Sequence, residues 1–489
     1  MIGHTLQGMK PIRRPFKKTL QDIQGKAISL AHSTADSLSS GLDRLLDRRI
    51  CLGVTGFSGS GKTTMITSLI HQLRYYPDAA LTAFPPALQN RLLGVEITPL
   101  SNLPLFPYSV GTDALSSSQW PKATREASAC LIEIKYRTRK SLMPGKNSGI
   151  GRLFLEIHDY PGEWLLDLPL LEMSYSHWSL QFHHQLKEST VPGSQQLLEN
   201  LSALDPLQPL PDFTLNALWQ QLLDYLHASQ KYGMTLIQPG RLLHMKPDSP
   251  ENLTPFIPLF SKTEMTEEQL REIPEHSLFK LCEKHYQHYI DEWVRPFYRD
   301  TFQKVDRQVV LIDVLQGLNQ GETILNDLCL GLTRVLQSFE YGHNSLIRKM
   351  FHPKVDRVAF AASKIDQVLP DQHEQVRSLT ASLIREAQRR ATFNNIDIRC
   401  EAVAAVRSTT CVEYQGRTLL KGNTDAGPGL LRHPLIPEHY PNDEDWEQLG
   451  QWQLRQLLPP TGLKLHNGGR LPHIRLDSLL NDLLGDKFL

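Results

Sequence analysis

The stretch Gly56-Phe57-Ser58-Gly59-Ser60-Gly61-Lys62-Thr63 fits the pattern G-x-x-x-x-G-K-[ST] at every position. An apolar run precedes it at residues 50–55, and a second segment with recurring Met, Ile and Leu follows at residues 64–70. The predicted order is therefore strand, glycine loop, helix. That context favours a phosphate-binding P-loop over the alternative, a plain Gly/Ser turn between a strand and a helix.

The residue types in this stretch suit a nucleotide phosphate chain. Glycines let backbone N–H groups approach phosphate oxygens, and the following helix directs its positive end to the same place. Lys62 would reach the β- and γ-phosphates, and the Thr63 hydroxyl would hold a Mg²⁺ ion. The residues expected to bind the nucleotide here are Ser58, Gly59, Ser60, Gly61, Lys62, Thr63 and Thr64.

Composition indicates an ordinary globular protein of more than one structural unit. Of the 489 residues 40% are hydrophobic and 21% charged, and 52 basic residues balance 52 acidic ones. This neutrality argues against a protein that coats nucleic acid, so we expect no nucleic-acid partner. The six cysteines form no C-x-x-C pair, and no apolar run reaches the length of a membrane span. A cytoplasmic protein is expected, with peripheral attachment to the inner membrane left open.

Apolar runs of strand length alternate with helical patterns along the chain. Strands are predicted at 92–97, 127–137, 152–158, 307–313, 355–362 and 396–404, the second and third forming a hairpin, and helices at 215–226, 278–298, 323–339 and 374–392. Such alternation predicts a doubly wound α/β fold interrupted by a helical insertion.

We expect five regions from these patterns. The last contains Leu476, Leu479, Leu480, Leu483 and Leu484, a stripe that predicts a docking helix, with a partner-binding or membrane-lying helix as the alternative. The regions are a basic arm and N-terminal helix (1–48), a first part of the nucleotide-binding domain (49–163), the helical insertion (164–305), a second part of that domain (306–410) and a C-terminal extension (411–489).

A second motif, Asp159-x-x-Gly162, comes at the end of a predicted strand. Its carboxylate could belong to the Mg²⁺ site and the Gly162 N–H could contact a γ-phosphate, so that this loop would respond to a triphosphate. Asp313, which follows a run of four aliphatic residues, is a rival for the metal-site aspartate. Asp159 is preferred because it carries the paired glycine.

Two further elements concern the base. Ser363-Lys364-Ile365-Asp366 resembles the [NT]-K-x-D element of GTPases, in which the aspartate accepts hydrogen bonds from guanine and the lysine stem lies along the base. Because serine replaces the usual Asn or Thr, the choice between GTP and ATP as the nucleotide stays open. Ala405-Val406-Arg407 follows the last predicted strand, at the position where a backbone N–H would meet guanine O6.

With these parts in this order, the sequence resembles the YcjX-like family of bacterial P-loop proteins, which are related to GTPases and associated with envelope stress. The resemblance implies a Ras-like α/β fold with a mostly parallel sheet, helices on both faces and a largely helical insertion. It is carried by residues 56–64, 120–125, 158–164, 363–366, 404–407, 472–476 and 485–487.

The resemblance also implies residues for turnover. Thr124 is the expected switch threonine that closes on Mg²⁺, with Thr112 as runner-up, and Arg125 is a candidate for stabilising transition-state charge. Glu163 stands where many GTPases carry a water-orienting glutamine, and its negative charge predicts slow hydrolysis.

The expected function is therefore a Mg²⁺-dependent GTPase that cycles between GTP and GDP and acts as a conformational switch on an unidentified protein partner, which could itself be membrane-associated. Two alternatives stay open: a nucleotide-binding interaction module with little turnover, and an ATPase or small-molecule kinase.

Overall fold

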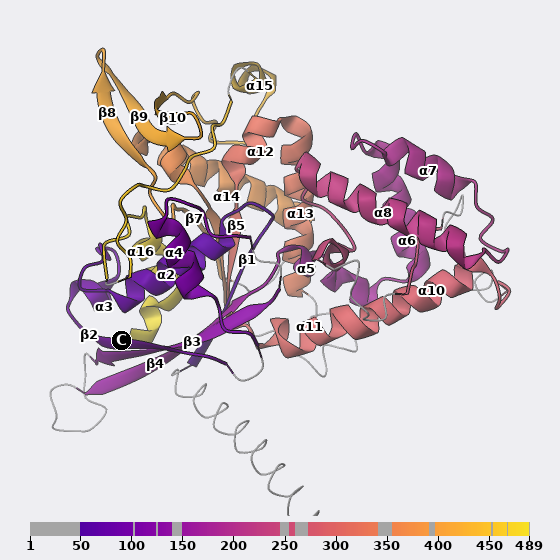
Figure 1. Ribbon diagram of the computed structural model, residues 1–489, viewed down its shortest axis with the longest axis horizontal. Coiled ribbons are helices and arrows are strands. Elements are labelled where there is room, and N and C mark those ends of the chain that lie inside the picture. The colour runs from indigo at the N-terminus through magenta and orange to yellow at the C-terminus, as the bar shows by residue number, and fades with distance from the viewer. Residues whose placement is uncertain are drawn as a thin grey trace, which may run out of the picture. The chain divides into compact units, whose positions relative to one another are not determined.

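A computed structural model of the chain (Figure 1) describes residues 49–100, 103–123, 126–138, 149–244, 254–259, 272–340, 355–390, 397–450, 453–466 and 468–488. The basic arm and N-terminal helix expected at residues 1–48 lie outside this set.

A seven-stranded sheet forms the centre of the fold, in the order β2-β3-β4-β1-β5-β6-β7. The pairs β1–β5, β5–β6 and β6–β7 are parallel, whereas β2–β3 and β3–β4 are antiparallel. The hairpin predicted between residues 127 and 158 is the β3–β4 pair. The strands are β1 (Arg49–Gly56), β2 (Leu92–Thr98), β3 (Ser128–Arg137), β4 (Ile150–Asp159), β5 (Arg307–Ile312), β6 (Arg357–Ala362) and β7 (Asp397–Ala402).

The central strands read as continuous apolar runs because both faces of the sheet are covered. All six residues of β5 are buried, and so are the last five of β6. One face packs with α2 (Lys62–Arg74) and α16 (Leu476–Leu484), and the other with α12 (Val314–Gln320), α13 (Glu322–Glu340) and α14 (His373–Arg390). This is the Ras-like α/β arrangement, with helices on both faces of a mostly parallel sheet.

The leucine stripe near the end of the sequence belongs to α16. All five leucines are at most 1% exposed and pack into the same core cluster as β1 and β5. Arg307, which is 2% exposed at the start of β5, donates to the carboxylate of Asp486 with 2.6 Å between Nη2 and Oδ2. The stripe therefore faces the sheet, as the docking interpretation predicts.

Helices follow β4 and lead to β5. They are α5 (Glu163–Leu166), α6 (Tyr175–Glu188), α7 (Ser194–Ser202), α8 (Asp212–Tyr232), α10 (Leu278–Tyr289) and α11 (Arg295–Asp300). Aromatic side chains fill the core of this insertion: Trp178 stacks on Tyr286 with ring centroids 5.3 Å apart, and Phe256 meets both rings.

One long helix predicted at residues 278–298 is divided. A π-turn at Ile290–Val294 separates α10 from α11, and a proline lies in the first turn of α11. Because proline has no N–H to donate to the preceding turn, the α-helical ladder cannot continue unchanged through it.

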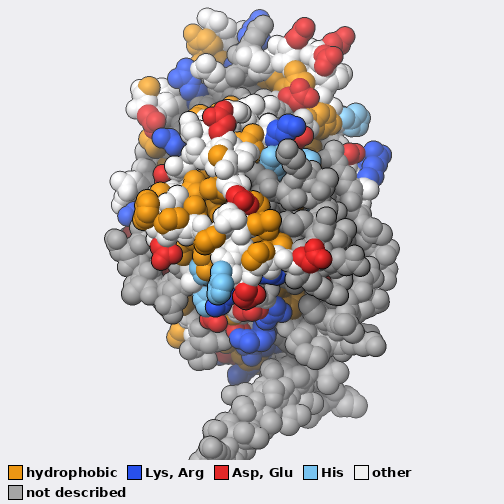
Figure 2. All heavy atoms as spheres, turned by 90° about the vertical axis from the view of Figure 1, so that its right-hand side faces the viewer, with side chains coloured by type: hydrophobic (Ala, Val, Ile, Leu, Met, Phe, Trp, Pro, Cys, Tyr) orange, Lys and Arg blue, Asp and Glu red, His pale blue; other side chains and the backbone are white. Residues whose placement is uncertain are grey.

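Figure 2 views the insertion from the right-hand side of Figure 1 and shows apolar side chains among the charged ones on this face. Leu207, which precedes α8, is 47% exposed, and Phe213 in the first turn of α8 is 78% exposed. Among the helices of the described residues, none is long and apolar enough to cross a membrane.

A small antiparallel sheet follows β7, and the sequence analysis did not predict it. It consists of β8 (Thr409–Tyr414), β9 (Arg417–Thr424) and β10 (Gly427–Leu431). Gln415 and Gly416 form the β8–β9 turn with φ of 51° and 71°, the left-handed geometry of a tight hairpin. The strands are short and half-exposed, so their apolar alternation is faint. A short helix, α15 (Asp443–Leu449), comes after them.

Candidate functional site

The glycine loop joins β1 to α2 as the sequence predicts. Gly59 and Gly61 have φ of +76° and +89°, and a Cβ on either would meet no atom within 4 Å. The loop therefore faces open space at these positions. Gly61 is the N-cap of α2 and supplies no side-chain cap, so the first-turn amides of a 13-residue helix point toward that space.

Polar side chains of the loop suit a phosphate chain. Lys62 is 8% exposed, and its amine donates to the carbonyl of Gly56 over 2.7 Å. The hydroxyl of Ser60 is buried and has no hydrogen-bond partner among the described residues. Thr63 is half-buried at the start of α2. An unpartnered buried hydroxyl beside an amine and a helix N-terminus fits a bound anion.

The Asp159-x-x-Gly162 loop packs directly on the glycine loop. Asp159, the last residue of β4, is 2% exposed. A Cβ on Gly162 would come within 2.3 Å of the carbonyl oxygen of Gly56, so only glycine allows the two loops to approach this closely. Oxygen ligands from Thr63 and Asp159 are the type that Mg²⁺ prefers.

The rival aspartate has other partners. Asp313 caps α12 by accepting a hydrogen bond from the amide of Gln316 over 3.1 Å, and its Oδ2 lies 2.6 Å from the amine of Lys364. Asp313 thus holds the lysine of the Ser363–Asp366 motif. These contacts agree with the preference for Asp159, which stays a prediction.

Asp366 lies in a turn just after β6 and is 4% exposed. Its Oδ2 accepts hydrogen bonds from the amide of Ser408, over 2.8 Å, and from the Ser408 hydroxyl. Burial raises the pKa of Asp366, and the Ser408 hydrogen bonds offset that rise only in part. Sequence reasoning missed Ser408, whose only signal is that it directly follows the Ala405–Arg407 element.

The Ala405–Arg407 segment is clamped between α2 and the end of the chain. The carbonyl of Ala405 accepts a hydrogen bond from Ser68 of α2 over 2.6 Å. The amide of Arg407 donates to the carbonyl of Pro472 over 2.8 Å, and Ala404 pairs with Ile474. Two segments that carry the family resemblance, at 404–407 and 472–476, are therefore hydrogen-bonded to each other.

Glu163 meets the insertion. It directly follows Gly162, is 4% exposed, and its Oε2 lies 3.5 Å from Nε2 of His244. Burial raises the pKa of Glu163, but the interaction with His244 and the charge of Lys62 outweigh it and hold the pKa below its ordinary value. His244 was not predicted, because 81 residues separate it from Glu163 and no motif marks it.

Two buried carboxylates hold the segment before His244 in place. Asp167 accepts the amides of Gly240 and Arg241, over 2.7 and 3.0 Å, and the hydroxyl of Tyr289. Asp327 of α13 accepts the amide of Leu236 over 3.0 Å and also that of Thr235. Residues 235–241 are thus tied both to the turn after Glu163 and to α13.

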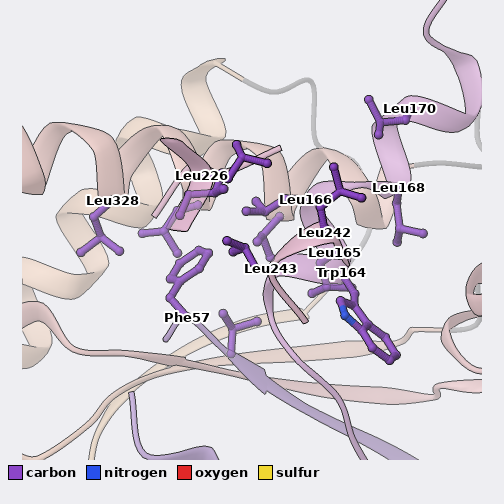
Figure 3. Close-up of a cluster of buried hydrophobic side chains, with 14 of the residues drawn as sticks. Phe57, Trp164, Leu165, Leu166, Leu168, Leu170, Leu226, Leu242, Leu243 and Leu328 are labelled. Carbon is purple, nitrogen blue, oxygen red and sulfur yellow. The ribbon is translucent and has the colours of Figure 1, made fainter. Parts of the chain in front are cut away.

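The glycine loop itself reaches the insertion through Phe57, which is 7% exposed. Figure 3 shows its ring at the end of β1, pointing toward Leu226, Leu243 and Leu328. A Cβ on Gly331 of α13 would lie 3.3 Å from the ring, so the helix approaches it closely. One apolar cluster therefore connects the phosphate loop, α8, α13 and the segment that ends at His244.

Of the predicted switch residues, the structure describes only the runner-up. Thr124 and Arg125 lie outside the described residues. The runner-up Thr112 is in α4 (Tyr108–Ser116), where it is 4% exposed and its hydroxyl donates to the carbonyl of Ser109 over 2.9 Å. Its hydroxyl faces its own helix.

A second group of metal-ligand atoms lies on β1 and β4. Atoms of Cys51, Glu156 and His158 lie within 4.8 Å of one another. The Glu156 carboxylate and Nε2 of His158 are 2.6 Å apart, so these two groups already satisfy each other. The arrangement is explained by that hydrogen bond.

Comparison with known proteins gives one consistent result. Residues 50–488 match the model of the YcjX-like family, DUF463. A protein described as Ras-like GTPase YcjX, from Escherichia coli (strain K12), is 34% identical over 463 residues, which cover 92% of this chain and 98% of that protein. A second protein of that description, from Shewanella oneidensis, is 34% identical over 498 residues, covering 96% and 98%. The phosphate loop, the Asp-x-x-Gly loop and a match along nearly the whole chain show that the chain belongs to the YcjX-like family.

Proposed function

We propose that this chain binds guanine nucleotides with Mg²⁺, hydrolyses GTP to GDP and works as a conformational switch. The names of its two relatives support GTP hydrolysis as the activity. The stress-related setting that the family resemblance implies, a cytoplasmic location and an unidentified protein partner belong to the same proposal.

The observation that carries the proposal is the shared edge of the sheet. Gly56 of β1 pairs in parallel with β5, and β5 pairs in parallel with β6, which ends at Ala362. The phosphate loop and the Asp366 turn therefore leave the sheet at the same edge, where ligands of doubly wound folds bind. The hydrogen bond from Ser68 to Ala405 joins the helix after the phosphate loop to the base-binding side.

Each predicted residue has a role in this proposal. Residues 58–64 would receive the phosphates, and Asp366, held by Ser408, would accept hydrogen bonds from the guanine edge. Thr63 and Asp159 would hold Mg²⁺, which neutralises charge on the phosphate oxygens when bound. Lys62 would turn its amine from the Gly56 carbonyl to the phosphates, because that carbonyl is a weaker partner than an anion.

The contacts of Glu163 favour slow hydrolysis. A depressed pKa keeps its carboxylate ionised close to the phosphate loop, where it can orient water but also repels the γ-phosphate. Because the same turn is bonded to residues 235–241, a change at Gly162 would be transmitted to the insertion. That connection supports a switch in which the insertion carries the signal to a partner.

The test is single-turnover hydrolysis of GTP by the purified chain and by Lys62→Ala. We expect the wild type to hydrolyse GTP faster than the variant by about a hundredfold or more, since Lys62 stabilises charge on the phosphates. Equal rates would exclude turnover and leave the nucleotide-binding module as the function.

Base choice forms the second arm of the test. In the proposal, GTP outcompetes ATP, and Asp366→Asn shifts the preference toward xanthine nucleotides, because an amide presents a donor where guanine also donates. ATP outcompeting GTP, with the preference unchanged in Asp366→Asn, would favour the ATPase or kinase instead.

A further inference from the structure

The insertion places an ionisable side chain, His244, next to Glu163. His244 ends the 3₁₀ turn Gly240–His244, and its side chain is 14% exposed. Nε2 lies 3.5 Å from Oε2 of Glu163 and makes no hydrogen bond with any of the described residues, so Glu163 is a carboxylate within ion-pair distance of a buried nitrogen that has no hydrogen-bond partner there. Glu163 in turn follows Gly162, which packs on Gly56 of the phosphate loop.

The backbone holds this turn against Glu163. A Cβ on Gly240 would lie 2.3 Å from the carbonyl oxygen of Glu163 and 2.9 Å from the Cβ of Glu163. The backbone of the turn therefore packs directly against Glu163. Asp167 accepts the amides of Gly240 and Arg241, and Leu243 packs against the cluster that contains Phe57. The position of His244 is thus fixed at both ends of a five-residue turn.

A carboxylate at this place has two opposing effects on hydrolysis. It can accept a hydrogen bond from the attacking water, and it adds negative charge next to the γ-phosphate. A neighbouring imidazole that donates to the second carboxylate oxygen would fix the carboxylate's orientation and withdraw part of its charge. Lys62 cannot supply this hydrogen bond, because its amine donates to the Gly56 carbonyl of the phosphate loop.

We propose that His244 is a positioning residue for GTP hydrolysis: it holds the Glu163 carboxylate so that the other oxygen orients the attacking water, and turnover therefore requires a docked insertion. This inference rests on the proposed function. In the step itself the water oxygen bonds to the γ-phosphorus and the bond to the β–γ bridging oxygen breaks. GDP leaves with that electron pair, and the proton of the water leaves with inorganic phosphate.

The experiment is a double-mutant cycle under single-turnover conditions with saturating Mg²⁺ and GTP, using the full chain. We expect His244→Ala to slow hydrolysis by about tenfold or more while the Kd for GTP changes by less than about threefold. In the Glu163→Ala background the same change should have no effect, because the group that His244 positions is gone. His227→Ala, an exposed histidine of α8, is the matched control and should hydrolyse GTP at the wild-type rate.

Two further variants keep the test decisive if His244→Ala does not fold. Glutamine can place an N–H close to the position of Nε2, whereas the shorter asparagine cannot, so His244→Gln should hydrolyse near the wild-type rate and His244→Asn should be slow. An unchanged rate in His244→Ala, or an equal loss with and without Glu163, would overturn the inference while leaving the GTPase proposal intact. Absence of hydrolysis by the wild type would overturn both.

Discussion

At the scale of single residues, the buried carboxylates of Asp167 and Asp327 decide how the insertion meets the nucleotide-binding part. Both accept backbone amides of residues 235–241, and burial raises the pKa of each to about 6 despite those hydrogen bonds. Each is therefore close to a change of protonation in mildly acidic solution. We therefore expect the contact between Asp167 and the amides of Gly240 and Arg241 to be sensitive to pH.

Asp167 gives a prediction with a defined sign. Between its ordinary pKa of 3.8 and about 6, the folded chain keeps a proton that the unfolded chain has released, so the free energy of unfolding falls as pH rises through this range. Asparagine does not titrate. Asp167→Asn should therefore cost more stability at pH of about 4.5 than at about 7, by ~2 kcal/mol.

Urea unfolding of the wild type and Asp167→Asn at both pH values measures this difference. Asp78→Asn, at an exposed aspartate, is the control and should cost the same small amount at each pH. A cost of Asp167→Asn that does not vary with pH would contradict the raised pKa.

At the scale of elements, the loop between β1 and α2 has two faces. Gly59 and Gly61 face open space, whereas Phe57 is inserted among leucines of α8, α13 and the turn before His244. A phosphate loop with one buried aromatic anchor cannot move without disturbing the insertion. The state of the loop and the packing of the insertion are thus physically coupled.

Phe57→Ala should lower the free energy of unfolding by about 3 kcal/mol or more, because it leaves a cavity in a closed cluster. It should also weaken nucleotide binding, because the loop loses its anchor. Urea unfolding and nucleotide titration measure the two effects. Phe213→Ala, at a phenylalanine that is 78% exposed, should change either quantity little. Similar results for the two variants would show that Phe57 is not an anchor.

Local sequence patterns predicted the elements whose residues restrict the local structure most strongly. The glycine loop, the hairpin and the buried strands β5 and β6 have sequences that only a few local structures accommodate, and they occur as predicted. The strands β8–β10 were missed because half-exposed residues leave no clear period. Ser408 and His244 were missed for another reason: their partners Asp366 and Glu163 are 42 and 81 residues away, and only the tertiary fold brings them together.

At the scale of the whole molecule, α16 covers one face of the sheet together with α2. The leucines of α16 fill the core between β1 and β5, and Arg307 fixes the following turn through Asp486 and the carbonyl of Leu483. Residues 472–474 also pair with the segment after β7. Removing this region would expose part of one face of the sheet and loosen the segment after β7.

Leu480→Asp tests this dependence, because it places a charge at a position that is 0% exposed. We expect a loss of several kcal/mol in unfolding free energy, or failure to fold, since an unpaired buried charge is costly. Thermal and urea unfolding measure it. Leu435→Asp, at a leucine that is 74% exposed, should be tolerated, and equal effects of the two changes would contradict a structural role for α16.

The docking of α16 also bears on how the chain is made. The phosphate loop leaves the ribosome more than 400 residues before α16, so the core that β1 and α2 share with α16 stays incomplete until α16 has been synthesised. During translation the nascent chain therefore exposes the apolar side chains that α16 later covers, the kind of surface that chaperones recognise. The sheet that carries the phosphate loop would thus reach its full stability only after α16 has been synthesised.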